Sequence, residues 1–268
     1  MAFLMADNKL HFEYWRQKAA SITFTQGAAA TGHNFENAFD NNPATTFKMS
    51  GASQPIIVVQ FNALRKINAV GVSNVNLSGA ALEIYTSTDG VTYTMFKSFL
   101  SSTTTQFKVV SSLIEAKYIK FEFQGATSAN YIGDISIGYA TSNHIKFQAP
   151  HTPALFAPLE NKGKRNNNGR ALITDTQEKP QDLKLTIKNL KESDFTGKYM
   201  YDTDTEVWWT ELSKNLVQFP FYVSTRDVTS IEENGAAYYC VLKDGLQQPR
   251  FTSPGFLELN IDCLGYYK

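Results

Sequence analysis

The sequence predicts a mainly β protein, with an N-terminal jelly-roll β-sandwich followed by a C-terminal α+β domain. Short runs of β-branched and aromatic residues, separated by Gly, Asn, Asp and Ser, recur from residue 21 to about residue 139. No helical periodicity separates these runs, which favours an antiparallel sandwich over a βαβ fold. A convincing amphipathic helix is expected only in the second half, at 205–216.

The strands of the first half are predicted from its apolar and aromatic runs. They lie at 55–61, 67–72, 81–87, 118–123 and 131–137. Asp89 and Gly90 separate two such runs, at 82–85 and 92–96. This dipeptide supplies the positive φ angles that a tight turn needs, so a β-hairpin is expected here.

The composition changes after residue 142. Three prolines fall between residues 150 and 158, and the stretch 161–169 is polar, basic and rich in Asn. These features predict a linker and then an exposed loop. We therefore divide the chain into a β-sandwich at 1–142 with its core at 20–140, a linker and exposed loop at 143–170, and an α+β domain at 171–268.

The second half combines strands with the one helix. Strands are expected at 182–190, 219–224, 237–242 and 256–264. Asp204 or Thr205 can cap the helix, and Glu206 favours its N-terminal dipole. The helix lines one face with Val207, Trp208, Leu212 and Leu216. A sheet that carries one main helix is an α+β arrangement.

Length and charge limit the classes of partner. A chain of 268 residues suits two domains, and 43% hydrophobic residues suffice for packed cores. Lys plus Arg and Asp plus Glu number 25 each, so nucleic acid is not an expected partner. No run approaches the ~20 apolar residues of a membrane helix, and the first residues lack the pattern of a signal peptide. We expect no membrane insertion and synthesis in the cytoplasm.

Neither the cysteines nor the histidines form a recognisable catalytic or metal motif. Cys240 and Cys263 lie in strand-like contexts, which favours buried free thiols over a disulfide. The four histidines are scattered, and no phosphate-binding loop, nucleophile elbow or zinc-protease motif is present. The chain is therefore not expected to be an enzyme.

A turn rich in oxygen donors lies at 37–47. Asp40, Asn41, Asn42 and Thr45 offer side-chain oxygens on a turn tightened by Pro43. A calcium ion binds 6 to 8 such oxygens. The same residues also suit an Asx-rich turn that is held by its own hydrogen bonds without a metal.

Three segments, in order, resemble the discoidin-type, galactose-binding-like (F5/8 type C) domain. They are Ala38 to Phe47, where the family usually ends on Trp, the stretch 84–93 with its Asp-Gly turn, and Lys117-Tyr-Ile-Lys120. The match covers about residues 20–140. The resemblance implies a jelly roll and a structural calcium ion held by Asp40, Asn42, Thr45 and Asp134, although Asp134 departs from the family's usual acidic residue.

The resemblance also implies a ligand site on loops at one end of the sandwich. The residues in such loops are His33, Asn34, Phe35, Asn74, Asn76, Asn130 and Tyr131. An exposed aromatic ring there can stack on a sugar, which predicts carbohydrate binding. The alternative is that the loop aromatics close the end of the core.

The order of elements in the second half resembles the hub domains of distal-tail and minor tail proteins of long-tailed bacteriophages. This resemblance implies a structural protein of the phage tail tip, located in the virion. Its partners would be copies of itself in a ring, with six subunits in the family, tail-tube and tail-tip proteins, and a glycan on the host surface. The alternative is a free-standing, lectin-like carbohydrate-binding protein.

The basic stretch 162–170 has two interpretations. Lys162, Lys164, Arg165 and Arg170 place four positive charges within it. It can serve as a subunit-contact arm that orders on assembly, or it can be a solvated loop.

Overall fold

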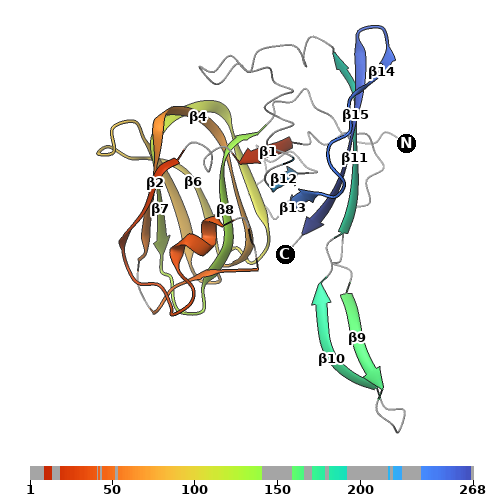
Figure 1. Cartoon of the computed structure of the whole chain (residues 1–268). Helices are drawn as coiled ribbons and strands as arrows, with labels where there is room; N and C mark the ends of the chain where they lie inside the picture. The colour runs from red at the N-terminus through yellow and green to blue at the C-terminus, as the bar shows by residue number, and fades with distance from the viewer. Residues whose placement is uncertain are drawn as a thin grey trace.

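In the part of the chain that the structure describes, thirteen strands form one hydrogen-bonded network, and two further strands, β9 and β10, form a separate hairpin (Figure 1). The architecture is that of a computed structural model of the chain. The structure describes residues 9–13, 19–40, 42, 44–51, 54–140, 159–165, 171–178, 181–191, 217, 220–224 and 237–266.

The N-terminal half is an antiparallel β-sandwich, as predicted. Its elements are β2 (Ala19–Gln26), the 3-10 helix η1 (Phe35–Phe39), β3 (Phe47–Lys48), β4 (Ile56–Asn76), β5 (Ala81–Ser87), β6 (Thr94–Leu100), β7 (Gln106–Gln124) and β8 (Tyr131–Ala140). The runs predicted as separate strands at 55–61 and 67–72 belong to the single long strand β4.

Two long strands bend from one layer of the sandwich into the other. The first part of β4, 56–60, pairs with β2 and with 118–122 of β7. Its last part, 69–76, pairs with β8 and, over 69–72, with the start of β7. The register shifts between these parts, and Figure 1 shows β4 arching over one end of the sandwich. We call the layer with β2, β5 and β6 the first layer, and the layer with β3 and β8 the second layer.

The hydrophobic core lies between the two layers. Alternate residues of a strand face the same side, so Ile57, Val59 and Phe61 of β4 all point inward and are buried. Aromatic rings tie the layers together: Phe47 packs edge-on against Phe123, with ring centroids 5.5 Å apart. This alternation of apolar and polar residues is what the sequence pattern predicts.

Asn74 changes which alternate residues of β4 face the core. Its φ angle of 44° lies in the left-handed region, which Asn tolerates better than most residues. Val72 before it and Val75 after it are consequently both buried in the core. Gly71 and Ser73 face the opposite side, away from the core.

The hairpin predicted around Asp89 and Gly90 is confirmed, but its turn differs from the prediction. Strands β5 and β6 pair from Ala81 with Leu100 to Thr86 with Thr94. Gly90 has a φ of 79°, whereas Asp89 has no positive φ. The strands are joined by the longer loop 88–93, which depends on the Asp89 side chain rather than on a two-residue turn.

Asp89 organises this loop as a hydrogen-bond acceptor. Its Oδ1 accepts bonds from the amides of Val91 (2.8 Å) and Thr92 (2.9 Å) and from the hydroxyl of Ser87 (2.8 Å). Led by the Val91 amide, these bonds lower the pKa of Asp89 from 3.8 to about 2. They favour the ionised carboxylate in the folded state.

Asp89→Ala should lower the melting temperature at pH 7, and the deficit should shrink as the pH falls towards 2. A carboxylate whose pKa is lower in the folded state contributes stability that is complete above its unfolded pKa of 3.8 and is lost on acidification. Thermal melts of both proteins at pH 7, 4 and 2 measure this. Glu115→Ala, at a carboxylate 57% exposed, is the control. A deficit that stays constant with pH would contradict the assignment.

The C-terminal half continues the antiparallel network. Strand β15 (Phe256–Tyr266) lies between β11 (Gln181–Lys191) and β13 (Ala237–Leu242), and β14 (Arg250–Ser253) pairs with its first residues. Strand β12 (Phe221–Ser224) pairs with β13. These strands confirm the predicted runs. The helix predicted at 205–216 lies outside the described residues.

Strand β1 (Lys9–Glu13) connects the two halves of the molecule. It pairs with β12 on one side and with β8 on the other, both antiparallel. The order β11–β15–β13–β12–β1–β8 therefore runs from the C-terminal strands into the sandwich.

Within the described part of the chain, no helix is both long and apolar enough to cross a membrane.

Part of the segment predicted as linker and exposed loop is a strand. β9 (Leu159–Arg165) pairs antiparallel with β10 (Ala171–Glu178), and Figure 1 shows this hairpin extending away from the other strands. The residues of β9 are mostly polar and basic and include no β-branched or aromatic side chain, so the sequence holds no strand signal. Backbone hydrogen bonds to β10 form regardless of side-chain type.

Both cysteines are free and buried, as predicted. Cys240 of β13 and Cys263 of β15 lie on neighbouring strands, and their side chains are hydrogen-bonded. Burial, followed by this hydrogen bond, raises the pKa of the Cys240 thiol well above 9.0.

Candidate functional site

A row of outward-facing side chains crosses three strands at the end of the sandwich that carries η1. The register pairs Lys48 of β3 with Tyr131 of β8, and Tyr131 with Asn76 of β4. The neighbouring pair, Phe47 and Ile132, lies in the core, so the row faces the opposite way. We call Lys48, Tyr131 and Asn76 the rim row; each is partly exposed.

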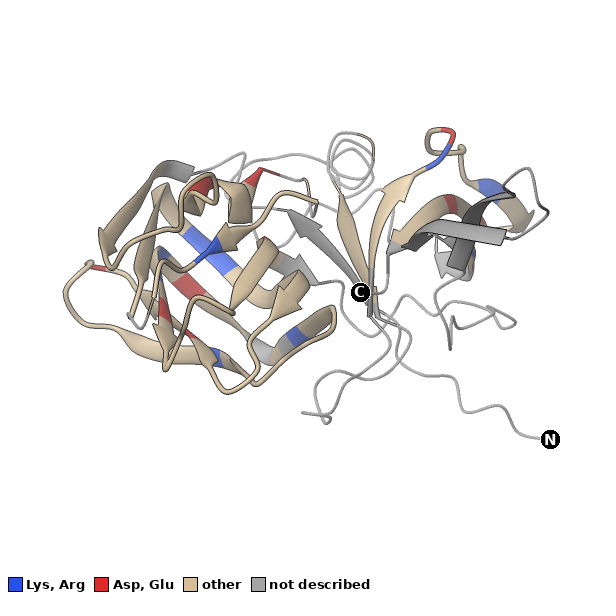
Figure 2. Cartoon of the chain, turned by 90° about the horizontal axis from the view of Figure 1, so that it is seen from below, with Lys and Arg blue, Asp and Glu red and all other residues tan. Residues whose placement is uncertain are grey.

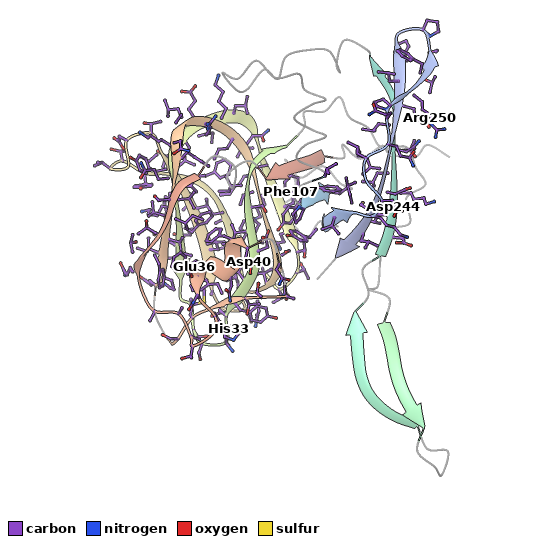
Figure 3. The ribbon with its side chains drawn as sticks, in the orientation of Figure 1. His33, Glu36, Asp40, Phe107, Asp244 and Arg250 are labelled. Atoms are coloured by element: carbon purple, nitrogen blue, oxygen red, sulfur yellow. The ribbon has the colours of Figure 1, made fainter. Side chains whose placement is uncertain are left out.

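His33 lies beside the rim row, at the end of the sandwich shown in Figure 3. Its carbonyl oxygen accepts a hydrogen bond from the Lys48 amide at 3.3 Å. Its Nδ1 lies 3.1 Å from the Thr46 carbonyl oxygen and 2.9 Å from the Thr46 hydroxyl. These contacts to Thr46 hold the imidazole ring in place beside the rim row, and which ring nitrogen donates depends on the tautomer.

Asn34 and Phe35 take different positions. Asn34 precedes η1, is exposed and makes no side-chain capping bond, so its amide faces solvent. Phe35 stacks on Phe24 with ring centroids 5.4 Å apart and packs against the core. This packing of Phe35 is what we expect of an aromatic residue that closes the end of the sandwich.

Asn130 supports the rim from beneath. It is 1% exposed, and its Oδ1 accepts a hydrogen bond from the Thr127 amide at 2.7 Å. Its Nδ2 donates to the carbonyl oxygens of Asn76 (3.3 Å) and Ser78 (3.1 Å). The sequence places Asn130 among the candidate ligand residues, but a side chain this buried positions the loops. Asn74, also among the candidate ligand residues, likewise has a structural role, because its left-handed φ angle changes which residues of β4 face the core.

Asn76 contributes to the same support. Its Nδ2 donates to the Ala129 carbonyl oxygen at 3.1 Å, and its Oδ1 accepts from the Ser78 amide at 3.2 Å. The rim row is therefore held by bonds that join the loops 77–80 and 125–130. Lys48 carries no sequence signal for this site, because only the register of β3 on β8 brings it beside Tyr131.

The structure brings together three of the four predicted calcium ligands. Asp40 Oδ1 accepts from the Asn42 amide at 2.8 Å, and Asp40 Oδ2 accepts from the Thr45 hydroxyl at 2.5 Å. Asn42 Oδ1 accepts from the Ala44 amide at 3.2 Å. Both carboxylate oxygens of Asp40 thus accept hydrogen bonds within the turn, as in an Asx-rich turn.

Asp134, the fourth predicted ligand, is fully buried and directed elsewhere. Its Oδ2 accepts hydrogen bonds from the hydroxyls of Ser136 (2.9 Å) and Tyr222 of β12 (3.2 Å). It lies opposite Ser73 on the side of β8 that faces away from the core. The described residues contain no group of three or more His, Cys, Asp or Glu side chains arranged to hold a metal.

Three of the four basic residues predicted as a subunit contact lie on one strand. Lys162, Lys164 and Arg165 belong to β9. Arg170 lies outside the described residues. In the view of Figure 2, basic and acidic residues of the described part of the sandwich are interspersed rather than gathered by sign.

An aromatic cluster occupies the outer surface of the first layer, which the sequence did not indicate. Lys120 Nζ lies 4.7 Å from the ring centre of Tyr85 and 4.6 Å from that of Tyr93, and it pairs with Glu122 at 2.6 Å. The Tyr85 hydroxyl donates to Glu83 at 2.7 Å. This bond, followed by desolvation, raises the pKa of Tyr85 to about 12. Lys120 thus occupies the space between the two rings.

The fold defines the N-terminal half as an antiparallel jelly-roll module, with the rim row at the end that carries η1 and the loops 77–80 and 125–130. Residues 19–136 match the family model of the F5/8 type C domain. The sandwich is therefore an F5/8 type C domain, and the resemblance predicted for about 20–140 is confirmed in this region. No curated protein matches the chain.

Several solved structures are similar to part of the chain. The CBM32-1 and CBM32-2 domains of Clostridium perfringens ZmpB are 17% identical with a TM-score of 0.41, covering 48% of this chain and 36% of that one. A pectin-binding carbohydrate-binding module is 19% identical with a TM-score of 0.36, covering 45% and 90%. CBM32-1 from a family 31 glycoside hydrolase of Clostridium perfringens is 15% identical with a TM-score of 0.38, covering 46% and 98%.

Proposed function

We propose that the F5/8 type C domain binds a carbohydrate at the rim row. The observation that supports this most is the outward position of Tyr131 between Lys48 and Asn76, at the loop-bearing end of the sandwich. A sugar ring has an apolar face that stacks on an aromatic side chain, and hydroxyls that bond to neighbouring polar groups. Nε2 of His33 and the amide of Asn34 extend the polar groups beside this row.

The mixed charge of the surroundings favours a neutral ligand over a polyanion. Basic and acidic residues are interspersed over the described part of the sandwich in Figure 2, and such mixed charge does not create the positive field that attracts phosphates. Calcium binding stays a prediction, and the proposal includes no catalytic step.

Tyr131→Ala should remove most of the glycan binding while the domain stays folded. Loss of the stacking surface should weaken the affinity about tenfold or more, which corresponds to ~1.4 kcal/mol. A glycan array identifies a ligand for the wild-type chain, and calorimetric titration measures both affinities. Tyr118→Ala is the matched control, because Tyr118 is also partly exposed but pairs with Gln60 near the bend in β4. Equal losses in the two variants would argue against the rim row.

For the whole chain we propose a structural role in the tail tip of a long-tailed bacteriophage, located in the virion. Its partners would be copies of itself in a ring, tail-tube and tail-tip proteins, and a host-surface glycan. The β9–β10 hairpin supports this role, since it extends away from the other strands (Figure 1). An isolated two-stranded hairpin is marginally stable in water, so a neighbouring subunit would stabilise it. The competing proposal is a free-standing, lectin-like protein.

Reversing the charges of Lys162, Lys164 and Arg165 to Glu should prevent ring assembly and leave glycan binding unchanged. We expect light scattering to give a mass near a multiple of 30.0 kDa for the wild-type chain, alone or with tail-tube protein, and 30.0 kDa for the variant. Lys97→Glu in the sandwich is the control for added negative charge. A wild-type chain that stays monomeric with tail proteins and binds a glycan would favour the lectin-like role.

A further inference from the structure

The outer face of the second layer is buried, although it points away from the sandwich core. Ala69, Ser73, Asp134 and Ser136 are each at most 1% exposed, and Phe107 is 4% exposed. In a sandwich that stood alone, this face would contact water. The C-terminal strands cover it instead, and Figure 3 shows Phe107 beside β1 and β12.

Tyr222 of β12 is the centre of this contact. Its ring stacks on Phe107 with centroids 6.0 Å apart and an interplanar angle of 11°, and it packs edge-on against Tyr239 at 5.2 Å. The four residues Ala69, Phe107, Tyr222 and Tyr239 form a hydrophobic cluster separate from the sandwich core. Two of them belong to the F5/8 type C domain and two to the C-terminal strands.

Gly71 of β4 makes the space for the Tyr222 ring. A Cβ atom at this position would lie 2.7 Å from two carbons of the ring, closer than such atoms approach in proteins. Any larger residue would therefore displace the ring. Glycine is required here because the backbone and the ring approach each other closely. The backbone conformation is not the reason, because Gly71 has no positive φ angle.

A buried polar contact adds specificity to this apolar one. The Tyr222 hydroxyl donates to Asp134 Oδ2 at 3.2 Å. A buried carboxylate needs hydrogen-bond donors, because desolvation without them is costly. One of the donors to Asp134 therefore comes from the C-terminal half. Strand β1 adds main-chain pairing to both sides of the same junction.

We infer that the F5/8 type C domain and the C-terminal strands form one rigid, cooperatively folding body, locked by insertion of Tyr222 into the notch at Gly71. The domain is then not a module that swivels on a linker. The rim row keeps a constant orientation relative to the C-terminal half. A protein that binds the C-terminal half therefore also sets the orientation of the rim row. The inference is independent of which ligand the rim binds.

Two measurements on the full chain test the lock. Calorimetry should show a single unfolding transition for the wild-type chain, and ¹⁵N relaxation should give one rotational correlation time for both halves. Gly71→Leu fills the notch and should give separate correlation times for the halves. Two unfolding transitions and separate tumbling in the wild-type chain would overturn the inference, as would a Gly71→Leu chain that behaves like wild type.

A milder variant keeps the test valid if Gly71→Leu does not fold. Tyr222→Phe retains the ring and removes only the bond to Asp134. Amide hydrogen exchange at 71–73 and 134–136 should accelerate roughly tenfold, the effect of one lost hydrogen bond. Tyr118→Phe, on the other layer, should leave these amides unchanged. Unchanged exchange in Tyr222→Phe would overturn the role of this contact.

Discussion

Phe47→Ala should destabilise the protein by about 3–5 kcal/mol, the usual cost of truncating a fully buried phenylalanine. Phe47 is 0% exposed and contacts Phe24 at 5.9 Å and Phe123 at 5.5 Å between ring centroids. It therefore joins β2, β3 and β7 in the core. Removal of the Phe47 ring leaves a cavity, which the rings of Phe24 and Phe123 could fill only by moving. Urea unfolding followed by circular dichroism gives the free energy of unfolding.

Phe251→Ala is the matched control for this substitution. Phe251 lies on β14 and is 66% exposed, so its truncation should change the free energy of unfolding by less than ~0.5 kcal/mol. A loss for Phe47→Ala as small as that of the control would show that Phe47 is not a core residue. Phe47 also precedes the rim residue Lys48, so glycan binding should weaken together with stability.

Asn130→Ala should cost about 1–3 kcal/mol and also weaken glycan binding. The substitution leaves the Thr127 amide and the carbonyl oxygens of Asn76 and Ser78 without their partner. Buried polar groups that lose their partner carry a desolvation penalty of this size. Because these bonds hold the loops beneath the rim row, both the free energy of unfolding and the glycan affinity should fall.

Asn130→Asp separates the two functions of the amide. Aspartate keeps an acceptor for the Thr127 amide, but at pH 7 it places a charged oxygen against two carbonyl oxygens. Asn130→Asp should therefore destabilise the protein at least as much as Asn130→Ala does at pH 7. Its destabilising effect should be smaller at pH 3 than at pH 7. Asn34→Ala, at an exposed residue without a capping bond, is the control for stability. An Asn130→Ala protein as stable as this control would refute the supporting role.

The candidate site was only partly predictable from the sequence. The loop residues at 33–35 and 130–131 were identified through the resemblance to the discoidin-type family, which implies a ligand site on loops at one end of the sandwich. Lys48 was not, since its position depends on the pairing of β3 with β8, which lie more than eighty residues apart. Asn130 was placed among the candidate ligand residues because it falls in such a loop, but it is buried and donates to the carbonyl oxygens of Asn76 and Ser78.

The sequence by itself determined the main strands of the sandwich, the Asp89 hairpin and the F5/8 type C domain at 19–136, because these depend on local alternation, turn residues and an ordered set of motifs. The tertiary structure alone decided how the halves meet. Gly71, Asp134 and Tyr222 carry no signal for one another, being separated by up to 151 residues, which is 222 minus 71. Their contact follows from the strand register, the turn of β4 at Asn74 and the pairing of β1 with both halves. Long-range packing of this kind depends on complementary shape and on paired polar groups, neither of which a linear pattern records.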